Sequence, residues 1–426
     1  MNHPTKSFEV LDDWLPWLET LSPREIVLGL ERVQEVLGRL DLGRPQFVVH
    51  VAGTNGKGSS VAMLDALLRT DGVRTGCYTS PHVSRYNERI CVDGTPATDE
   101  QIVAALERVE SARGEVPLTY FEFGTLAALV VFDTAATDGW LLEVGMGGRL
   151  DAVNAVEPDA SLITNISLDH CAWLGDDIES IAREKAGIMR SAKPAVYGSA
   201  SVPEAIRQTA AELGAQLLIA GVDFDFTARP DCGTTWSWRG QRHEIDGLRR
   251  PALAGDVQVG NAAAVLALIE ALDMEHLLTR EHINEALAGI SLQGRFQVID
   301  ELWILDVAHN LAAARALKKS LRARFATGKV LAVVGMLKDK DVTGFVSELD
   351  EQIDAWIAVS VAGPRVASAC QLGQEIANAT GKPCRIVDDI KEALEIAAEQ
   401  AAPGDEILVT GSFYVVGPAL DWLRSN

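Results

Sequence analysis

The segment GTNGKGS, at residues 53 to 59, joins a short apolar run to the start of an expected helix. Successive backbone amides followed by a helix N-terminus offer N–H donors to phosphate oxygens, and Lys57 adds a positive charge. The glycines let the main chain approach the phosphates closely. The pattern predicts binding of the ATP phosphates by Gly53, Thr54, Asn55, Gly56, Lys57, Gly58 and Ser59.

This loop differs from the common pattern GxxxxGK[ST] at two positions. Val51 occupies the place of the first glycine, and Gly58 stands where a Ser or Thr hydroxyl usually binds Mg²⁺. A simple glycine-rich turn is the alternative, in which Ser59 and Ser60 only cap the helix. If ATP binds, the metal ligands must come from elsewhere in the chain.

Three polar residues, Ser80, Glu143 and His170, each follow or end a run expected to be an apolar strand. The carboxyl ends of parallel strands share one edge of the sheet, where ligands of open α/β sheets gather. Taken alone, Glu143 fits a solvated loop residue and His170 fits a structural histidine. Glu143 stands next to the glycines at 145, 147 and 148, which makes it a candidate for a ligand site, whereas Ser80 and His170 are singled out only by the resemblance given next.

Together with the phosphate loop, four longer segments resemble a single family. They are TSPH at 79–82, LLEVGMGGRLDAVN at 141–154, LDHCAWLG with REKAGI between 168 and 188, and DVAHN at 306–310. In these segments the chain resembles the bacterial folylpolyglutamate synthases that also act as dihydrofolate synthase, which belong to the Mur ligases. The resemblance implies an ATP-dependent ligase that adds L-glutamate to dihydropteroate and to folylpolyglutamates through an acyl phosphate.

The resemblance also assigns roles to the strand-end residues. Ser80, Glu143 and His170 are implied to bind Mg²⁺, with two ions in the site. Lys185 is implied to carry a CO₂-derived carbamate, and Lys57, Lys185 and His170 to be catalytic. An ammonium beside Mg²⁺ is repelled, whereas a carbamate is an anion that supports the metal. Without the resemblance, Lys185 fits an exposed helix lysine.

Further ATP contacts are implied for Asn261, which would bind the base, and for Arg295 and Asp306. Arg295 lies in the linker between the expected domains, so we expect it to reach phosphates when the domains close. His309 follows Asp306 closely, but His309 and Asn310 could simply cap the next helix. For the pterin substrate the matching residues are Glu25, Ile26, Val27, Leu28, Thr119, Tyr120, Phe121, Glu122, Leu150, Asp151 and Ala152.

Composition limits the possible partners. The chain of 426 residues has 38 Lys and Arg against 60 Asp and Glu, a net charge of -22, which disfavours nucleic acid. Six separated cysteines without a CxxC pair argue against a zinc site and a disulfide framework. The apolar runs are too short for a membrane span and no signal peptide is evident, so we expect a cytoplasmic monomer.

The order of elements predicts an α/β protein with two domains. Residues 1–293 alternate strands and helices, typical of a mostly parallel sheet, and 222–248 add a small antiparallel β element. Residues 294–426 restart the alternation as a Rossmann-like α/β domain, which we expect to help bind glutamate. An expected helix from Glu25 to Leu40 begins after Ser22-Pro23, and another begins at Phe123.

Two other functions compete with the folate ligase. A Mur ligase acting on a UDP-linked cell-wall precursor would carry a UDP-binding domain of about 100 residues before the loop, whereas here 52 residues precede Gly53. A nucleotide-binding module that is not a ligase would bind Mg²⁺ through the residue after Lys57, which is Gly58. Both are disfavoured, and the substrates expected are dihydropteroate, reduced folates and L-glutamate.

Overall fold

The computed structural model describes residues 6–22, 27–228, 235–324, 328–360 and 367–425. The chain forms two compact units. Unit 1 comprises Met1–His82, Tyr86–Pro251 and Val259–Ile290, and unit 2 comprises Val83–Arg85, Ala252–Gln258 and Ser291–Asn426. The predicted boundary between residues 293 and 294 lies near the last of these junctions. The two short segments that join unit 2 from within the first part of the chain were not expected.

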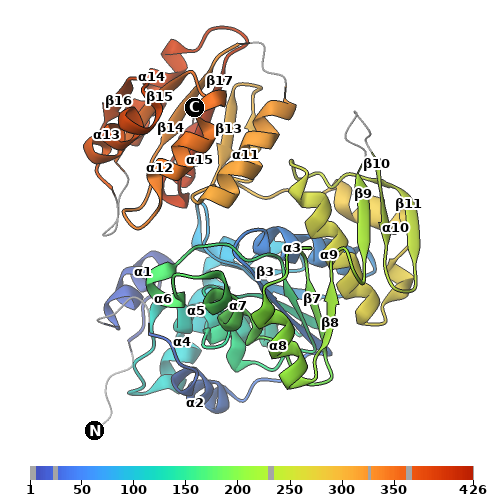
Figure 1. The fold of residues 1–426 in the computed structure, drawn as a ribbon. Helices are drawn as coiled ribbons and strands as arrows, with labels where there is room; N and C mark the ends of the chain where they lie inside the picture. Colours follow the sequence, from blue (N-terminus) through green and yellow to red (C-terminus); the bar gives the residue numbers. More distant parts are fainter. Residues whose placement is uncertain (1–5, 23–26, 229–234, 325–327, 361–366, 426) are drawn as a thin grey trace. The chain divides into compact units, whose positions relative to one another are not determined.

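Unit 1 is built on an eight-stranded sheet in the order β4-β3-β2-β5-β1-β6-β7-β8, in which the six strands from β2 to β8 are parallel (Figure 1). The central strand β1 is buried along its whole length, as expected for a strand covered on both faces. The strands are β1 (Phe47–Ala52), β2 (Thr75–Tyr78), β3 (Ile90–Val92), β4 (Thr95–Pro96), β5 (Gly139–Glu143), β6 (Ala160–Ile163), β7 (Pro194–Tyr197) and β8 (Gln216–Ile219).

Helices cover both faces of this sheet. One hydrophobic cluster joins α1, α2, α4, α5, α7 and α8 to it, while α3 contacts β1, β2 and β5 and also packs on α10. The helices of unit 1 are α1 (Leu11–Thr20), α2 (Glu31–Leu40), α3 (Lys57–Thr70), α4 (Asp99–Arg113), α5 (Tyr120–Thr134), α6 (Cys171–Leu174), α7 (Ile178–Ala186), α8 (Glu204–Leu213), α9 (Val257–Ala271) and α10 (Arg280–Ala288), with short 3₁₀ turns η1 (Tyr86–Arg89), η2 (Ala152–Ala155) and η3 (Glu275–Leu277).

A separate antiparallel sheet in unit 1 has the order β11-β10-β9 and lies beside α9 and α10 (Figure 1). Its strands are β9 (Asp225–Ala228), β10 (Thr235–Arg239) and β11 (Glu244–Arg249). The side chains of Trp236 and Trp238 are buried, and Trp238 Nε1 donates to the Ala263 carbonyl of α9 at 3.1 Å. The two tryptophans thus attach this sheet to the helical layer.

Unit 2 has a six-stranded sheet in the order β12-β13-β17-β14-β15-β16, parallel except for β12. Two hydrophobic clusters cover it, one with α11, α12 and α13 and one with α14 and α15. Its elements are β12 (Gln297–Ile299), β13 (Trp303–Asp306), α11 (Leu311–Ala323), β14 (Val330–Val334), α12 (Val342–Leu349), η4 (Asp350–Gln352), β15 (Ala355–Val359), α13 (Ala369–Thr380), β16 (Cys384–Val387), α14 (Ile390–Gln400), β17 (Glu406–Thr410) and α15 (Phe413–Ser425).

The predicted fold class is confirmed: a mostly parallel sheet with a small antiparallel element is followed by a Rossmann-like α/β unit. Two predicted helix starts are wrong. Helix α2 begins at Glu31 rather than Glu25, after Gly29 adopts φ +142°, which is outside the helical region. Helix α5 begins at Tyr120 rather than Phe123, because Thr119 and Glu122 form a capping box around its first turn.

In the part of the chain that the structure describes, the helices are too short or too polar to cross a membrane.

Candidate functional site

The phosphate loop connects β1 to α3 at the carboxyl edge of the large sheet. Gly53 has φ +146° and Gly56 has φ +86°, values that residues with a Cβ rarely adopt. A Cβ at Gly53 would also lie 1.9 Å from Thr164 Oγ1. The Lys57 ammonium donates to the carbonyl oxygens of Gly53 at 3.2 Å and Thr54 at 3.4 Å. Lys57 therefore lies folded back over the loop.

The segment that follows β6 holds this loop in place. Asn165 Oδ1 accepts the Asn55 N–H at 3.1 Å, and Asn165 Nδ2 donates to the Asn55 carbonyl at 2.8 Å. Thr164 Oγ1 donates to the same carbonyl at 2.7 Å, and the Thr54 N–H donates to the Asn165 carbonyl at 2.9 Å. The N–H groups of Thr54 and Asn55 are therefore engaged within the protein, and we expect phosphate donors nearer the start of α3.

Glu143 and Ser80 meet beside the loop. The Ser80 N–H donates to Glu143 Oε2 at 3.1 Å, and Lys57 Nζ lies 4.0 Å from Glu143 Oε1. A Cβ at Gly58 would lie 3.4 Å from Glu143 Oε2. The buried Glu143 carboxylate thus faces the loop position where the common pattern has its Ser or Thr. Carboxylate and hydroxyl oxygens suit Mg²⁺, which usually takes one or two carboxylates together with phosphate and water.

His170 immediately precedes the short helix α6, on the segment after β6. Its φ is +53°, in the left-handed region that a non-glycine residue seldom adopts, and its N–H donates to Asp169 Oδ1 at 2.9 Å. Within the described residues no three His, Cys, Asp or Glu side chains form a metal-binding group. The predicted set of Ser80, Glu143 and His170 includes a serine, so a search for three such side chains does not test it. Its role in metal binding stays a prediction.

Lys185 is buried on α7, and its ammonium donates to the Gly53 carbonyl at 3.0 Å. Burial, and then the charge of Lys57, lower the pKa of Lys185 to about 7, while Asp169 and Asp151 act in the opposite direction. The exposed-lysine reading of this residue is therefore wrong. A substantial neutral fraction at neutral pH is the condition under which an amine reacts with CO₂.

The three segments predicted to bind a pterin converge. The Gly29 N–H donates to the Leu150 carbonyl at 3.5 Å. The Arg32 guanidinium donates to the Val27 carbonyl at 2.9 Å and to Glu122 Oε1 at 2.6 Å. These contacts join the segment of Val27 and Leu28 to those of Thr119–Glu122 and Leu150–Ala152. Glu25 and Ile26 lie outside the described residues.

The carboxylates in this region differ in their environments. Glu122 accepts the Thr119 N–H at 2.7 Å in addition to the Arg32 contact, so both of its oxygens have protein partners. Asp151 is buried, which raises its pKa to about 6 although the Met146 and Val153 N–H groups donate to it. Of the two acids, Asp151 has the environment more typical of a functional carboxyl group.

The two aromatic residues predicted to contact the pterin, Tyr120 and Phe121, lie in different environments. Phe121 packs 5.8 Å from the ring of Tyr78, and a Cβ at Gly145 would lie 2.5 Å from Phe121 Cζ. Phe121 thus fills the space above the glycine backbone after β5. Tyr120 instead lies 6.1 Å from the Tyr86 ring, edge to face, and is half-buried.

Asn261 lies near the start of α9, against the phosphate loop. A Cβ at Gly56 would approach its side-chain oxygen to 2.8 Å and its nitrogen to 2.9 Å. The Asn261 amide is therefore packed on Gly56, next to the loop, which is compatible with the predicted nucleotide contact.

In unit 2, Arg295, Asp306 and His309 gather at the carboxyl end of β13. The half-buried Asp306 accepts the N–H groups of Phe296 and Ala308, both at 2.8 Å, and desolvation raises its pKa. Arg295 and His309 both flank the Phe413 ring, at 5.5 Å and 6.4 Å. His309 is thus a neighbour of Arg295 rather than the helix cap, since Asn310 caps α11.

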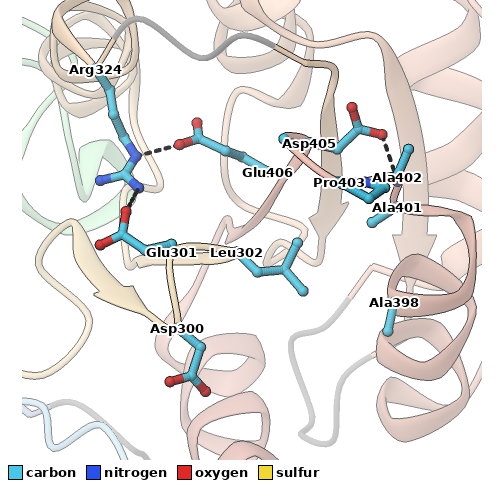
Figure 2. A pocket seen from close by; sticks show the side chains of 11 residues that line it. Asp300, Glu301, Leu302, Arg324, Ala398, Ala401, Ala402, Pro403, Asp405 and Glu406 are labelled. Carbon is cyan, nitrogen blue, oxygen red and sulfur yellow. Dashed lines mark hydrogen bonds and ion pairs between the residues drawn. The ribbon is translucent and has the colours of Figure 1, made fainter.

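The unit 2 pocket shown in Figure 2 has a volume of about 630 Å³. Arg324 lies between Glu301 and Glu406 there, and pairs with Glu301 at 3.2 Å. None of the predicted site residues lines this pocket, which is formed where β13 and β17 begin. It therefore lies at the sheet edge opposite the Asp306 cluster.

Three residues after β6 hold the phosphate loop in place, and we call them the loop clamp: Thr164, Asn165 and Ser167. None of them was predicted. Ser167 completes the loop clamp, because its N–H donates to Thr54 Oγ1 at 3.0 Å and its carbonyl accepts from the same hydroxyl at 3.2 Å. The only signal was a stretch in which the short polar residues Thr164, Asn165 and Ser167 are interrupted by Ile166 and Leu168. Such a run does not reveal its partner until β6 is placed beside β1.

Two family models match the chain. The Mur ligase middle domain matches residues 51–269, and the Mur ligase glutamate ligase domain matches residues 294–413. The first covers the phosphate loop and all predicted metal ligands, and the second covers most of unit 2.

The chain is similar to named proteins over nearly its whole length. It is 41% identical to the dihydrofolate synthase/folylpolyglutamate synthase of Escherichia coli K12, over 96% of this chain and 95% of that protein. It is 31% identical to the Bacillus subtilis protein of the same name, over 96% and 98%.

Solved structures of proteins with related names are also similar to the chain. The E. coli FolC structure in complex with DHPP and ADP has a TM-score of 0.92 at 40% identity, covering 98% of both chains. A bifunctional folylpolyglutamate synthase/dihydrofolate synthase with Mn, AMPPNP and L-glutamate bound has a TM-score of 0.90 at 42% identity, covering 99% of this chain and 100% of the other. With this fold, these motifs and this similarity, the chain belongs to the dihydrofolate synthase/folylpolyglutamate synthase family of Mur ligases.

Proposed function

We propose that the protein is an ATP-dependent ligase that joins L-glutamate to dihydropteroate and to folylpolyglutamates. The γ-phosphoryl group of ATP is transferred to a substrate carboxylate, which makes that group electrophilic. The α-amine of L-glutamate then attacks the acyl carbon and displaces phosphate, giving an amide, ADP and phosphate. Relatives with this name support the proposal, as do the ADP, AMPPNP and L-glutamate in the solved structures.

The observation that carries the proposal is the position of Glu143. Its carboxylate lies against Gly58 and Lys57 and accepts the Ser80 N–H, so a buried acid from β5 stands where a P-loop hydroxyl is missing. A divalent ion held by Glu143, Ser80 and His170 would neutralise charge on the phosphates during both steps. The family relatives bound to Mn ions support a divalent metal in this site.

The chain's own residues bind and orient the reactants. Lys57 and the amides at the start of α3 hold the phosphates, and Asn261 contacts the nucleotide base next to Gly56. Arg295 and Asp306 supply further nucleotide contacts from unit 2. The Asp306 carboxyl is fixed by two backbone N–H groups and by the nearby positive charge of Arg295.

Lys185 carries a carbamate in the active protein. Its burial, its lowered pKa and its contact with the Gly53 carbonyl favour a neutral amine beside the phosphate loop. Carbamylation converts this position to an anion, which removes the repulsion between Lys185 and both Lys57 and the metal. His170 and Asp169 follow β6 on the same side of the sheet and complete this part of the site.

The pterin ring binds among Val27–Leu28, Tyr120 and Leu150–Ala152. Tyr120 offers an aromatic surface, and Asp151 offers a carboxyl group whose raised pKa makes it a suitable partner for ring N–H donors. L-glutamate binds through residues 294–426, of which the glutamate ligase domain model matches 294–413. The protein acts as a monomer in the cytoplasm.

A direct test measures ADP release by purified protein with Mg²⁺, ATP and L-glutamate. Dihydropteroate, tetrahydrofolate and a UDP-muramyl acceptor are each added in turn, and products are identified by mass spectrometry. Stimulation by the first two, with one glutamate added per turnover, is expected. Stimulation by the UDP-muramyl acceptor alone would show a cell-wall ligase, and ATP hydrolysis that no acceptor changes would show a nucleotide-binding module.

A further inference from the structure

Arg89 is a half-buried arginine beside the site of unit 1. It ends η1 and directly precedes β3, and its carbonyl oxygen accepts the Thr79 N–H at 2.9 Å. Because Thr79 adjoins Ser80, the backbone of Arg89 is fixed next to a proposed metal ligand. Its side chain reaches Tyr120 in the proposed pterin site, since its Cζ lies 5.5 Å from that ring centre. Arg89 therefore joins the two halves of the site.

The side chains of His82, Tyr78, Tyr86 and Tyr120 surround the guanidinium. Its Nε donates to His82 Nδ1 at 2.8 Å, and its Cζ lies 5.5 Å from the ring centres of both Tyr86 and Tyr120. Because Arg89 Nε donates to His82 Nδ1, that ring nitrogen carries no proton and the imidazole is in its neutral form. An imidazole that accepts at Nδ1 adds no charge, and the cluster keeps the single positive charge of Arg89.

This charge has no acidic partner: among the residues that the structure describes, Arg89 pairs with no Asp or Glu. Other arginines of unit 1 with similar or greater exposure do have one, as in the pairs Arg32–Glu122, Arg149–Glu184 and Arg190–Glu157. Removing a guanidinium from water without a counter-charge costs free energy. The two stacked rings offset part of this cost, and an anionic ligand would offset more.

We propose that Arg89 binds the carboxylate of the acceptor substrate, the group that receives the phosphoryl group from ATP. The inference rests on the proposed ligase function. A ligand whose pterin ring contacts Tyr120 and whose benzoate carboxylate points toward Ser80 passes directly beside Arg89. The planar fork of N–H donors matches a carboxylate and fixes its orientation. Its charge also reduces the repulsion between that carboxylate and the γ-phosphate, which must approach each other for transfer.

The alternative is that Arg89 only holds His82, Tyr86 and Tyr120 together. The two roles differ in how they depend on the ligand. A residue that touches the carboxylate affects only ligands that carry one, whereas a purely structural residue affects every ligand of the pocket equally. The measurement must therefore compare dihydropteroate with its carboxamide, in which –CONH₂ replaces the carboxylate and the rest of the molecule is unchanged.

The test is a set of dissociation constants for these two ligands, measured by calorimetry with Mg²⁺ and ADP present. The wild-type protein is expected to prefer the acid by about tenfold, because a charge-assisted pair is lost with the amide. In Arg89→Gln the preference falls to less than twofold, while affinity for the amide stays within about twofold of wild type. Arg89→Lys, which keeps the charge without the planar fork, gives an intermediate ratio, and it carries the test if the Gln variant does not fold.

Arg108→Gln is the matched control. Arg108 lies on α4, donates to the Leu40 carbonyl and pairs with Asp133, so its loss should leave the acid-to-amide ratio unchanged. An unchanged ratio in Arg89→Gln, or an equal loss of both ligands, would overturn the role of Arg89 while leaving the ligase function intact. A wild-type protein that neither binds dihydropteroate nor releases ADP with it would overturn the function and this inference together.

Discussion

At the scale of single residues, Lys185 is the group whose chemistry depends most on its surroundings. Its ammonium is buried between the Gly53 carbonyl and the charge of Lys57. Replacing Lys185 with Ala should reduce turnover about a hundredfold, because the site then has neither a carbamate nor its charge. Steady-state ADP release with dihydropteroate measures this. Turnover equal to wild type would remove the carbamate from the mechanism.

The lowered pKa of Lys185 also has a pH-dependent consequence. The unfolded chain keeps this lysine protonated up to about pH 10.5, whereas the folded protein releases the proton near pH 7. Between these values the unfolded state binds more protons, so this residue makes the free energy of unfolding rise with pH. In Lys185→Met, urea titrations of CO₂-depleted protein from pH 7 to 9 should show a smaller rise. An equal rise in both proteins would contradict the burial of a titrating amine.

At the scale of elements, the segment after β6 acts on the loop after β1. Asn165→Ala removes both side-chain contacts to Asn55 and leaves that N–H and carbonyl with fewer partners. We expect the KM for ATP to rise about tenfold, with the KM for dihydropteroate nearly unchanged, because only the phosphate loop loosens.

Asn284→Ala serves as the matched control for Asn165→Ala. The Asn284 side chain accepts the Arg249 N–H of β11, away from the loop, so its loss should affect stability but not the KM for ATP. A rise in both Michaelis constants in Asn165→Ala would indicate general damage to the unit instead of a loosened loop.

The element scale also separates what the sequence pattern can predict from what it cannot. The glycines, Lys57 and the strand-end residues predict a ligand-binding site at the carboxyl edge of the sheet, because the conformation of such a motif depends mainly on its own sequence. Residues 79–82 and 141–154 then add family resemblance. The loop clamp was not predictable in this way, because it depends on β6 lying next to β1, which is a property of strand order. The start of α2 was missed because the helical spacing of apolar residues extends upstream of Gly29 to Val27 and Leu28, which are not helical.

The unpredicted elements have similar causes. Strands β3 and β4 are only three and two residues long, too short to show an alternating pattern, and β11 has a glycine at position 247. Helix α15 follows β17 after only Gly411 and Ser412, and it was not predicted. In each case the local sequence does not determine the element, which depends on contacts with distant parts of the chain.

At the scale of the whole molecule, metal removal should separate catalysis from folding. The sheets and helices of both units are held by apolar cores and backbone pairing, and no metal-binding group of three His, Cys, Asp or Glu was found among the described residues. EDTA should therefore abolish ADP release without changing the far-UV circular dichroism. Mg²⁺ or Mn²⁺ should restore turnover. Loss of the helical signal with EDTA would reveal a structural metal instead.

Each unit has its own core, so each should also have its own stability. Phe345 is fully buried in the core of unit 2, and Phe132 is fully buried in that of unit 1. Truncation to Ala should cost about 3–5 kcal/mol in the unit concerned, because a large cavity replaces the ring. Hydrogen exchange followed by mass spectrometry should show lost protection in β14 and β17 for Phe345→Ala, and in β1 and β5 for Phe132→Ala. If either variant lowered protection equally in both units, the chain would unfold as one cooperative body, and the two cores would not be energetically separate.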